Sequence, residues 1–308
     1  MPASFTDRLR GIHVATIVPM RADQSVDEVA LAAHIETVLS VDGVRGLLLN
    51  GHAGENFLLS SEERRRVVEI ARGVSATALI VSGVNCESSL DAAREAASFE
   101  AAGADGLLVF PTNSWALGVD PESVLLHHRM IRDASTLPMM LYGAPVGAGH
   151  WPYPADLLSR LAAEPRVVAI KEGSWEVAHY EANLRMLRGQ RPDFCVLGSG
   201  DEHLLTCYII GSHGSQVSLA AVIPELIVAL WDAAQRGDWE EARRLHERIY
   251  PLSVAIYRDG PAGRAAARLK TCLKLLGRLR SDAVRAPQLP CTADEITRLT
   301  RALEHALA

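Results

Sequence analysis

A lysine stands directly after a run of four apolar residues in the segment RVVAIKEGS, where Val167 to Ile170 lead into Lys171. A lysine that ends a buried strand either reaches solvent or lies in a closed site, where burial lowers the pKa of its ammonium group. The neutral amine is a nucleophile for carbonyl carbons, and the iminium ion that it forms withdraws electrons from an adjacent bond. Lys171 is therefore a candidate for Schiff-base (class I aldolase) chemistry, and the alternative is an ion pair with Glu172 or another acid.

Two other segments could support such an amine. Tyr142 ends another apolar run, and a phenol at hydrogen-bond distance can move protons on and off the reacting oxygen atoms. The alternative is a half-buried aromatic residue whose hydroxyl reaches water. The second segment is the turn formed by Gly51, His52, Ala53 and Gly54. Its backbone N–H groups could bind an anion such as a carboxylate, although a tight connection that needs glycine for its dihedral angles explains the same residues.

Eight short apolar runs of the kind that forms β-strands recur along the chain, at residues 13–20, 46–51, 78–84, 106–111, 138–145, 167–173, 194–200 and 215–219. Segments with helical periodicity lie between them, for example at residues 27–40, 61–74, 89–103 and 121–134. Alternating units of this kind specify a parallel sheet, and eight of them in this length suit a closed α/β barrel, the (β/α)8 or TIM barrel. The alternative is an open doubly wound sheet, but no run carries the GxGxxG turn of its dinucleotide site.

The pattern after the eighth run is helical only, with segments at residues 224–237, 238–257, 263–277 and 292–307. Asp238 and Thr292 stand where helix N-caps belong. We expect residues 1–237 to form the barrel and residues 238–308 to form a C-terminal helical extension. No Gly/Ser-rich or charged linker separates the two parts, so the extension should pack on the barrel.

The composition is that of a compact globular protein: 308 residues, 48% hydrophobic and 22% charged, with a formal net charge of -6. Acidic and basic residues alternate along the helical segments, which leaves no basic face for nucleic acid. No apolar run approaches the roughly 18 to 20 residues needed to span a bilayer, and the N-terminus lacks a signal-peptide core. We therefore expect a cytoplasmic protein with neither a nucleic-acid nor a membrane partner.

Histidines and cysteines do not indicate a metal site. His127 and His128 are neighbours on one predicted helix and face different directions, and no HxH or HExxH spacing occurs. The five scattered cysteines lack metal-ligand spacing and are expected to be buried free thiols. We therefore expect no metal site. Lys270 and Lys274, one helical turn apart, are expected to be surface charges.

In its lysine, tyrosine and glycine segments, the sequence resembles the dihydrodipicolinate synthase / N-acetylneuraminate lyase family of Schiff-base barrels. The similarity runs from about Gly11 to the C-terminus, through GIHVATIVPM, LLLNGHAGENFLLSSEERRRVV, YGAPVG, VVAIKEGS and PAGRAAARLKTCLKLLG. The resemblance implies that Lys171 forms the Schiff base and that Tyr142 relays protons. It implies further that the amides of His52 and Ala53 hold the carboxylate of a pyruvate-like 2-oxo acid, and that the protein is a homotetramer (a dimer of dimers) without metal or organic cofactor.

Three departures make this chain an atypical member of that family. His52 and Ala53 replace two hydroxyl residues, so hydroxyl support for the proton relay is missing, and His52 is expected to replace part of it. Gly147 stands where dihydrodipicolinate synthases place an arginine that grips a second carboxylate. Those enzymes also supply a tyrosine to the neighbouring subunit's site, from the position that is occupied here by Thr112, Asn113 and Ser114.

The sugar-acid lyases of the family suggest further substrate ligands. Asp201, Glu202 and Ser218 resemble their polyol-binding positions. Asp201 could equally be the N-cap of the helix that follows it. Gln216 should point into the barrel if strand alternation holds, as a polar group that sets specificity.

The sequence thus predicts a lyase or aldolase that forms a lysine Schiff base with pyruvate or a related 2-oxo acid and makes or breaks the adjacent bond. Gly147 favours a hydroxylated or aromatic 2-oxo acid over dihydrodipicolinate-type condensation. The alternatives are that condensation, a 2-keto-3-deoxy sugar acid dehydratase, and a catalytically silent barrel that binds 2-oxo acids. A non-covalent enzyme in which Lys171 orients a phosphorylated substrate is a further alternative.

Overall fold

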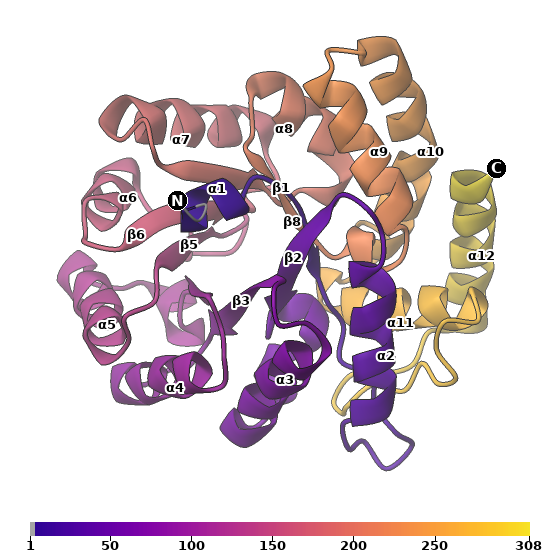
Figure 1. Cartoon of the computed structure of the whole chain (residues 1–308), viewed down its shortest axis with the longest axis horizontal. Coiled ribbons are helices and arrows are strands. Elements are labelled where there is room, and N and C mark those ends of the chain that lie inside the picture. Colours follow the sequence, from indigo (N-terminus) through magenta and orange to yellow (C-terminus); the bar gives the residue numbers. More distant parts are fainter. Residues whose placement is uncertain (1–3) are drawn as a thin grey trace.

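Eight strands, all of them parallel to their neighbours, close into a barrel in chain order, and a ring of helices surrounds it (Figure 1). The computed structural model describes residues 4–308. The strands are β1 (Gly11–Ala15), β2 (Val44–Leu49), β3 (Leu79–Val84), β4 (Gly106–Val109), β5 (Met139–Gly143), β6 (Val167–Glu172), β7 (Cys195–Gly198) and β8 (Gly214–Val217). Each predicted run overlaps one of them, so the predicted (β/α)8 barrel is confirmed.

The helices of the ring each follow one strand. They are α2 (Glu28–Leu39), α3 (Ser61–Val74), α4 (Ser89–Ala101), α5 (Pro121–Ala134), α6 (Ala155–Ala162), α7 (Val177–Gln190), α8 (Leu204–Ile210) and α9 (Pro224–Gln235). Short polar side chains begin several of them: Ser60, Ser88 and Asp120 accept backbone N–H bonds at the N-caps of α3, α4 and α5. Such caps satisfy donors that a helix N-terminus leaves unpaired.

Side chains fill the barrel interior, because successive residues of each strand point to opposite faces. On β5, Met140 and Tyr142 belong to the interior cluster, whereas Met139 and Leu141 pack in the layer between strands and helices. Phe5, from the short helix α1 (Phe5–Arg8), and Leu9 close this cluster at the N-terminal end of the barrel. The C-terminal ends of the strands are therefore where a site can open.

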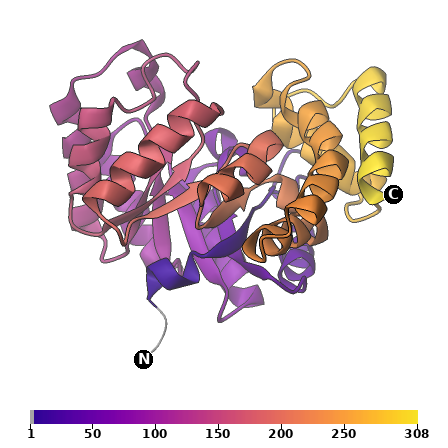
Figure 2. The same cartoon turned by 90° about the horizontal axis from the view of Figure 1, so that it is seen from above.

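Three more helices follow the barrel: α10 (Trp239–Tyr257), α11 (Ala265–Leu275) and α12 (Ala293–Leu307). Asp238 and Thr292 cap α10 and α12, as predicted. Figures 1 and 2 show these helices together on one side of the barrel. α10 packs on both α9 and α12, and α11 packs on η1 (His52–Gly54), the first of two 3-10 helices that follow β2. The C-terminal helices thus reach the predicted anion-binding turn.

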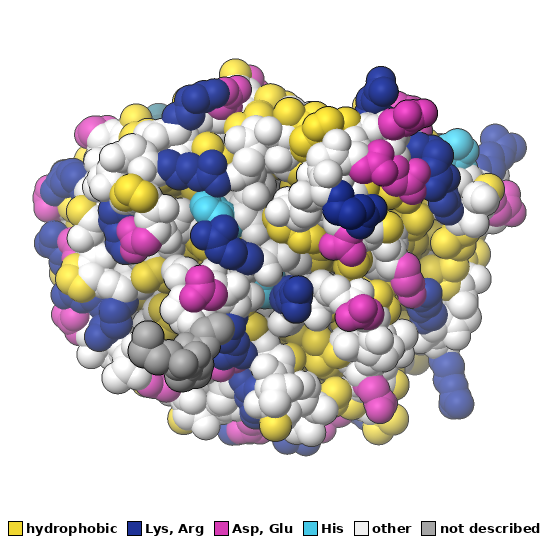
Figure 3. All heavy atoms as spheres, turned by 45° about the horizontal axis from the view of Figure 1, so that its top comes forward, with side chains coloured by type: hydrophobic (Ala, Val, Ile, Leu, Met, Phe, Trp, Pro, Cys, Tyr) yellow, Lys and Arg dark blue, Asp and Glu magenta, His cyan; other side chains and the backbone are white. Residues whose placement is uncertain are grey.

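The surface carries interleaved charges: on the face shown in Figure 3, Lys and Arg side chains lie among Asp and Glu side chains. Within residues 4–308, no helix combines the length and the hydropathy that crossing a lipid bilayer requires. All five cysteines are free thiols, as predicted, although Cys86 and Cys291 are only partly buried.

Candidate active site

Lys171 points into the barrel near the C-terminal end of β6. Strand alternation turns Lys171 inward and its neighbour Glu172 outward, toward α7. The Glu172 carboxylate accepts hydrogen bonds from Ser174 Oγ (2.9 Å) and Asn183 Nδ2 (3.0 Å) instead. The alternative of an ion pair between Lys171 and Glu172 is therefore wrong.

The Lys171 amine is nearly closed off from solvent, since its side chain is only 9% exposed. In the described part of the chain it makes no hydrogen bond or ion pair. Burial lowers the pKa of Lys171 to about 8, while the negative charge of Asp201 acts in the opposite direction. At pH 7 such a pKa leaves roughly a tenth of the amines neutral, against about one in 3,000 for an ordinary lysine. Burial therefore favours the neutral form of this amine, which is the nucleophilic form, more than in an ordinary lysine.

Tyr142 is the direct neighbour of Lys171 across the sheet, because β5 and β6 pair with Tyr142 opposite Lys171. Its ring packs 4.7 Å from that of Phe110, measured between centroids. Burial raises the pKa of Tyr142, so the hydroxyl keeps its proton at neutral pH. The hydroxyl has no hydrogen-bond partner among residues 4–308, which leaves it free to donate to a ligand beside the amine.

The predicted anion-binding turn adopts a conformation that leaves two amides free. Gly51 precedes η1, and the N–H groups of Gly54 and Glu55 bond back to the carbonyls of Gly51 and His52, each at 3.0 Å. The N–H groups of His52 and Ala53 have no acceptor within the described residues, and both residues line a cavity above Lys171. Two neighbouring free N–H groups on a cavity wall suit a carboxylate.

A buried ion pair connects the end of this turn to α11. Glu55, which has a left-handed backbone (φ 56°), and Lys270 of α11 form an ion pair in which both side chains are fully buried. Glu55 also accepts a bond from the backbone N–H of Arg285 at 3.2 Å. The prediction that Lys270 is a surface charge is therefore wrong, because α11 turns this residue toward the barrel, whereas Lys274 is half exposed as predicted.

His52 contributes a ring to the cavity wall. The imidazole stacks on Phe57 with the centroids 4.8 Å apart and lies 4.6 Å from Phe110. Burial, assisted by the charge of Lys171, lowers the pKa of His52 to about 3, so the ring stays neutral. It meets Tyr142 edge to face at 5.3 Å, and no described hydrogen bond joins the two. This geometry does not support the expectation that His52 replaces the missing relay hydroxyls.

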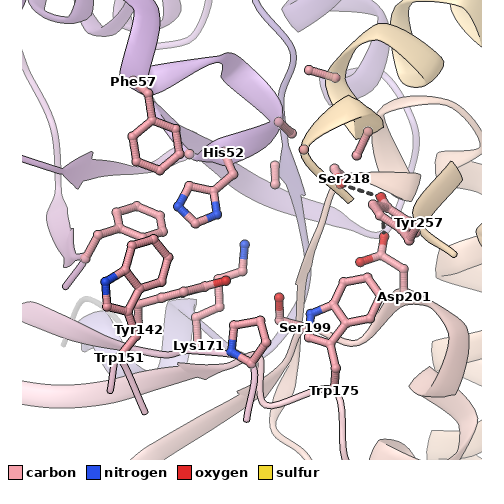
Figure 4. A pocket seen from close by; sticks show the side chains of 18 of the residues that line it. His52, Phe57, Tyr142, Trp151, Lys171, Trp175, Ser199, Asp201, Ser218 and Tyr257 are labelled. Atoms are coloured by element: carbon pink, nitrogen blue, oxygen red, sulfur yellow. Dashed lines mark hydrogen bonds between the residues drawn. The ribbon is translucent and has the colours of Figure 1, made fainter. Parts of the chain in front are cut away.

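Asp201 faces the cavity opposite Tyr142 (Figure 4). Its Oδ1 accepts hydrogen bonds from the Leu219 N–H and the Tyr257 hydroxyl, both at 2.9 Å, and the Tyr257 oxygen lies 2.5 Å from Ser218 Oγ. Burial raises the pKa of Asp201 to about 6. The alternative that Asp201 caps its own helix is wrong, because its carboxylate reaches across to the strand-eight loop and α10.

Two other predicted ligands lie outside the cavity wall. Glu202 forms an ion pair with Arg258, whose guanidinium stacks over Trp175 at 4.8 Å. Gln216 does point into the barrel, as alternation predicted, but it lies deeper, with its Nε2 amide nitrogen 3.8 Å from the sulfur of Met140. Neither residue lines the cavity, so a substrate contact from either remains a prediction only.

The cavity above Lys171 has a volume of about 630 Å³. Seven of the predicted site residues border it, namely Gly51, His52, Ala53, Tyr142, Lys171, Asp201 and Ser218, and Gly54 lies just behind them. The sequence analysis missed other lining residues, namely Phe57, Trp151, Trp175, Tyr257, Ala265 and Ala266. Trp175 follows the end of β6 by three residues, which is a usable signal, whereas Trp151 lies eight residues after the end of β5. Nothing in the sequence brings α10 and α11 to the site.

The departures from the family pattern also have clear positions. Gly147 lines the cavity, and a Cβ added there would meet no atom within 4 Å. Thr112 and Ser114 bond to each other through their hydroxyls (3.1 Å), outside the cavity wall, and the Ser114 N–H donates to Glu87. Neither hydroxyl stands in for the missing relay tyrosine in the single chain.

The histidines of α5 have partners within the fold. His128 Nδ1 lies 2.8 Å from the carbonyl oxygen of Val124, and His127 Nδ1 lies 3.0 Å from Ser89 Oγ. In the part of the chain that the structure describes, no group of three His, Cys, Asp or Glu side chains could hold a metal ion.

Known proteins share this architecture and sequence. The dihydrodipicolinate synthetase family, as a sequence model, matches residues 8–306. The 4-hydroxy-tetrahydrodipicolinate synthase of Nitrobacter hamburgensis is 30% identical over 303 residues, which are 97% of each chain. The crystal structure of dihydrodipicolinate synthase from Agrobacterium tumefaciens superposes with a TM-score of 0.89 at 28% identity and covers 98% of this chain and 100% of its own.

A third similar structure contains a bound ligand. A prophage protein of the dihydrodipicolinic acid synthase family from E. coli K12, solved in complex with pyruvate, has the same fold, with a TM-score of 0.89 at 24% identity and coverage of 97% and 99%. The fold is thus that of an aldolase and lyase family, and its members include named synthases. Because the match in sequence runs from residue 8 to residue 306 and the match in structure spans 98% of the chain, this protein belongs to the dihydrodipicolinate synthetase family.

Proposed function

We propose that this protein is a class I lyase or aldolase in which Lys171 forms a Schiff base with pyruvate or a related 2-oxo acid. One observation carries the proposal: the Lys171 amine is buried, has no acid bonded to it in the described chain, and opens into a cavity beside a protonated phenol. An amine with this environment is a nucleophile rather than a structural charge.

The 2-oxo acid group of the substrate would be bound at its carboxylate and at its ketone carbon. Its carboxylate would accept hydrogen bonds from the free N–H groups of His52 and Ala53, which places the ketone carbon next to the amine. Pyruvate bound to the E. coli family member supports this choice of ligand. Because the ketone carbon and the amine are then held together in one orientation, their reaction no longer depends on a bimolecular encounter in solution.

The reaction then follows from the amine and the phenol. Lys171 Nζ adds to the C2 carbonyl, and the carbinolamine loses water to give an iminium ion, with Tyr142 transferring protons to and from the oxygen. Loss of a proton from C3 gives an enamine, whose C3 attacks an aldehyde carbon while the aldehyde oxygen gains a proton. Water hydrolyses the new iminium ion, which releases a 4-hydroxy-2-oxo acid and the free amine. Cleavage is the same sequence in reverse.

Borohydride trapping tests the proposal directly. Reduction in the presence of pyruvate should convert the imine into a stable adduct on Lys171, located by peptide mass spectrometry. The chain has only three lysines, Lys171, Lys270 and Lys274, so the assignment is unambiguous. Lys171→Arg should abolish the adduct and Lys274→Arg should retain it. An unmodified Lys171, or an adduct on Lys274, would overturn the mechanism.

A further inference from the structure

Beyond the amine, aromatic rings from separate loops wall the cavity. The rings that line it belong to His52, Phe57, Phe110, Trp151, Trp175 and Tyr257. His52 is stacked between Phe57 and Phe110 at 4.8 and 4.6 Å, and Trp175 meets Tyr257 edge to face at 5.3 Å. The cavity therefore offers flat, polarisable surfaces on two sides.

The charged side chains around this cavity already have partners in the described chain. Glu55 is paired with Lys270, and Arg258 is paired with Glu202. The Glu176 carboxylate accepts the N–H of His179 at the start of α7, at 2.9 Å. Lys171 is the one lining cation without an acid bonded to it, and a Schiff base consumes that amine.

An anionic second substrate would therefore lack a counter-charge and would face Asp201. The arginine that could supply one in relatives is replaced by Gly147, as the resemblance indicated. A polyhydroxylated substrate would also fit poorly, because hydroxyls buried against ring faces lose their hydrogen bonds to water. An uncharged planar group gains from apolar burial and from stacking.

We propose that the second substrate, the aldehyde that is joined to or released from the 2-oxo acid, is an uncharged aromatic aldehyde, and that Trp151 and Trp175 determine this specificity. This inference rests on the proposed function. Figure 4 shows the two indoles on either side of Lys171 and Ser199. The ring would lie between them, and the aldehyde oxygen could bond to Tyr142 or to Ser199, whose hydroxyl also lines the cavity.

The product of synthesis follows from the balanced reaction. One carbon–carbon bond forms between C3 of pyruvate and the aldehyde carbon, one proton leaves C3, and one proton adds to the former aldehyde oxygen. Pyruvate and an aromatic aldehyde thus give a 4-aryl-4-hydroxy-2-oxo acid, with no oxidant, reductant or metal required.

An aldehyde panel tests the inference. Pyruvate would be combined with benzaldehyde, glyceraldehyde or succinic semialdehyde, and kcat/KM would be measured for each by product formation. Benzaldehyde should be preferred by about tenfold or more, the effect expected of one or two aromatic contacts. If Lys171 is trapped with pyruvate but glyceraldehyde or succinic semialdehyde reacts equally well, the inference fails while the proposed function stands. If no trapping occurs, the proposed function itself fails.

Variants separate the rings from the catalytic groups. Trp151→Leu and Trp175→Leu should each lower kcat/KM for benzaldehyde by about threefold to tenfold, a typical range for one aromatic contact, and lower kcat/KM for glyceraldehyde less, while pyruvate is still trapped on Lys171. Trp239→Leu is the matched control, because Trp239 is exposed at the start of α10. Gly147→Arg adds a cation where there is open space and should raise the activity with succinic semialdehyde. Unchanged preferences in both Trp variants would overturn the assignment.

Discussion

Asp201 and Lys171 face one cavity with opposite charges, and each shifts the pKa of the other. The carboxylate favours the protonated amine, and the amine favours the ionised carboxylate. The first prediction follows from this relation. Imine formation requires the neutral amine, so its rate should rise with pH and level off above about 8. Asp201→Asn removes the charge that retains the proton on Lys171, so the midpoint should move to lower pH.

The measurement is the rate of borohydride-trapped imine formation with pyruvate as a function of pH. Asparagine keeps an oxygen that can accept the bonds of Leu219 and Tyr257, so the local structure should survive. Glu202→Gln is the control, because Glu202 lies next in the chain but outside the cavity wall. A midpoint that stays in place or moves upward in Asp201→Asn would contradict the electrostatic relation.

Tyr142 gives the second prediction. Tyr142→Phe keeps the ring contacts with Phe110 and His52 but removes the proton donor beside the amine, so kcat should fall by about 10²- to 10⁴-fold. Steady-state kinetics of aldol formation would measure this loss. Tyr153→Phe is a buried control, whose hydroxyl contacts His128 rather than the cavity. Equal effects of the two substitutions would remove Tyr142 from the mechanism.

Among the site residues, those that lie on strands could be predicted from the sequence. Lys171 and Tyr142 are the penultimate residues of their strands, and alternation alone turns them inward. Strand alternation predicted correctly that the Gln216 side chain points into the barrel. It did not predict how far below the cavity the side chain lies, because this depth depends on the stagger between strands, which pairs Gln216 with His13. Glu202 and Lys270 lie on helices, where the partner depends on how distant elements pack.

Among the elements, the contact between α11 and the turn after β2 leads to the third prediction. Lys270→Met leaves the Glu55 carboxylate buried without its partner and should lower the free energy of unfolding by about 3–5 kcal/mol. It should also raise the KM for pyruvate, because the free amides of the turn lose their support. Denaturant titration and steady-state kinetics would measure the two effects.

The double variant Glu55→Gln/Lys270→Met separates charge from packing. It removes both charges, so it should recover most of the stability that Lys270→Met loses. Lys274→Met is the control, since Lys274 is half exposed and paired with Asp282 at the surface. If Lys270→Met were as stable as Lys274→Met, the ion pair would not hold the turn.

Element boundaries show what an apolar run can and cannot specify. The first run was predicted at residues 13–20, but β1 ends at Ala15. Ile17, Val18 and Met20 are buried in the layer beneath the helices rather than in the barrel ladder, and Pro19 has no N–H to donate to it. Burial makes a loop as apolar as a strand, so the run predicted the existence of the strand but not its end.

For the whole molecule, the family resemblance predicts a homotetramer, and one surface residue makes the prediction testable. Leu117, at the end of η3 (Asn113–Leu117), is 90% exposed in the single chain, in the loop that the family resemblance predicts to face the neighbouring subunit. Sedimentation velocity should give four times the mass of the chain. Leu117→Asp should shift the protein to smaller species, whereas Leu307→Asp, on α12, should not. A monomeric wild-type protein would contradict the prediction.

The order of synthesis gives the fixed turn after β2 a further consequence. Glu55 is bound by Lys270 and by the backbone of Arg285, two residues near the end of the chain. A ribosome makes the turn early and these two partners late. A nascent chain that stalls before residue 270 would contain every strand of the barrel and Lys171, but neither of these two partners of the Glu55 carboxylate. The Glu55–Lys270 ion pair can therefore form only after all eight strands have been synthesised.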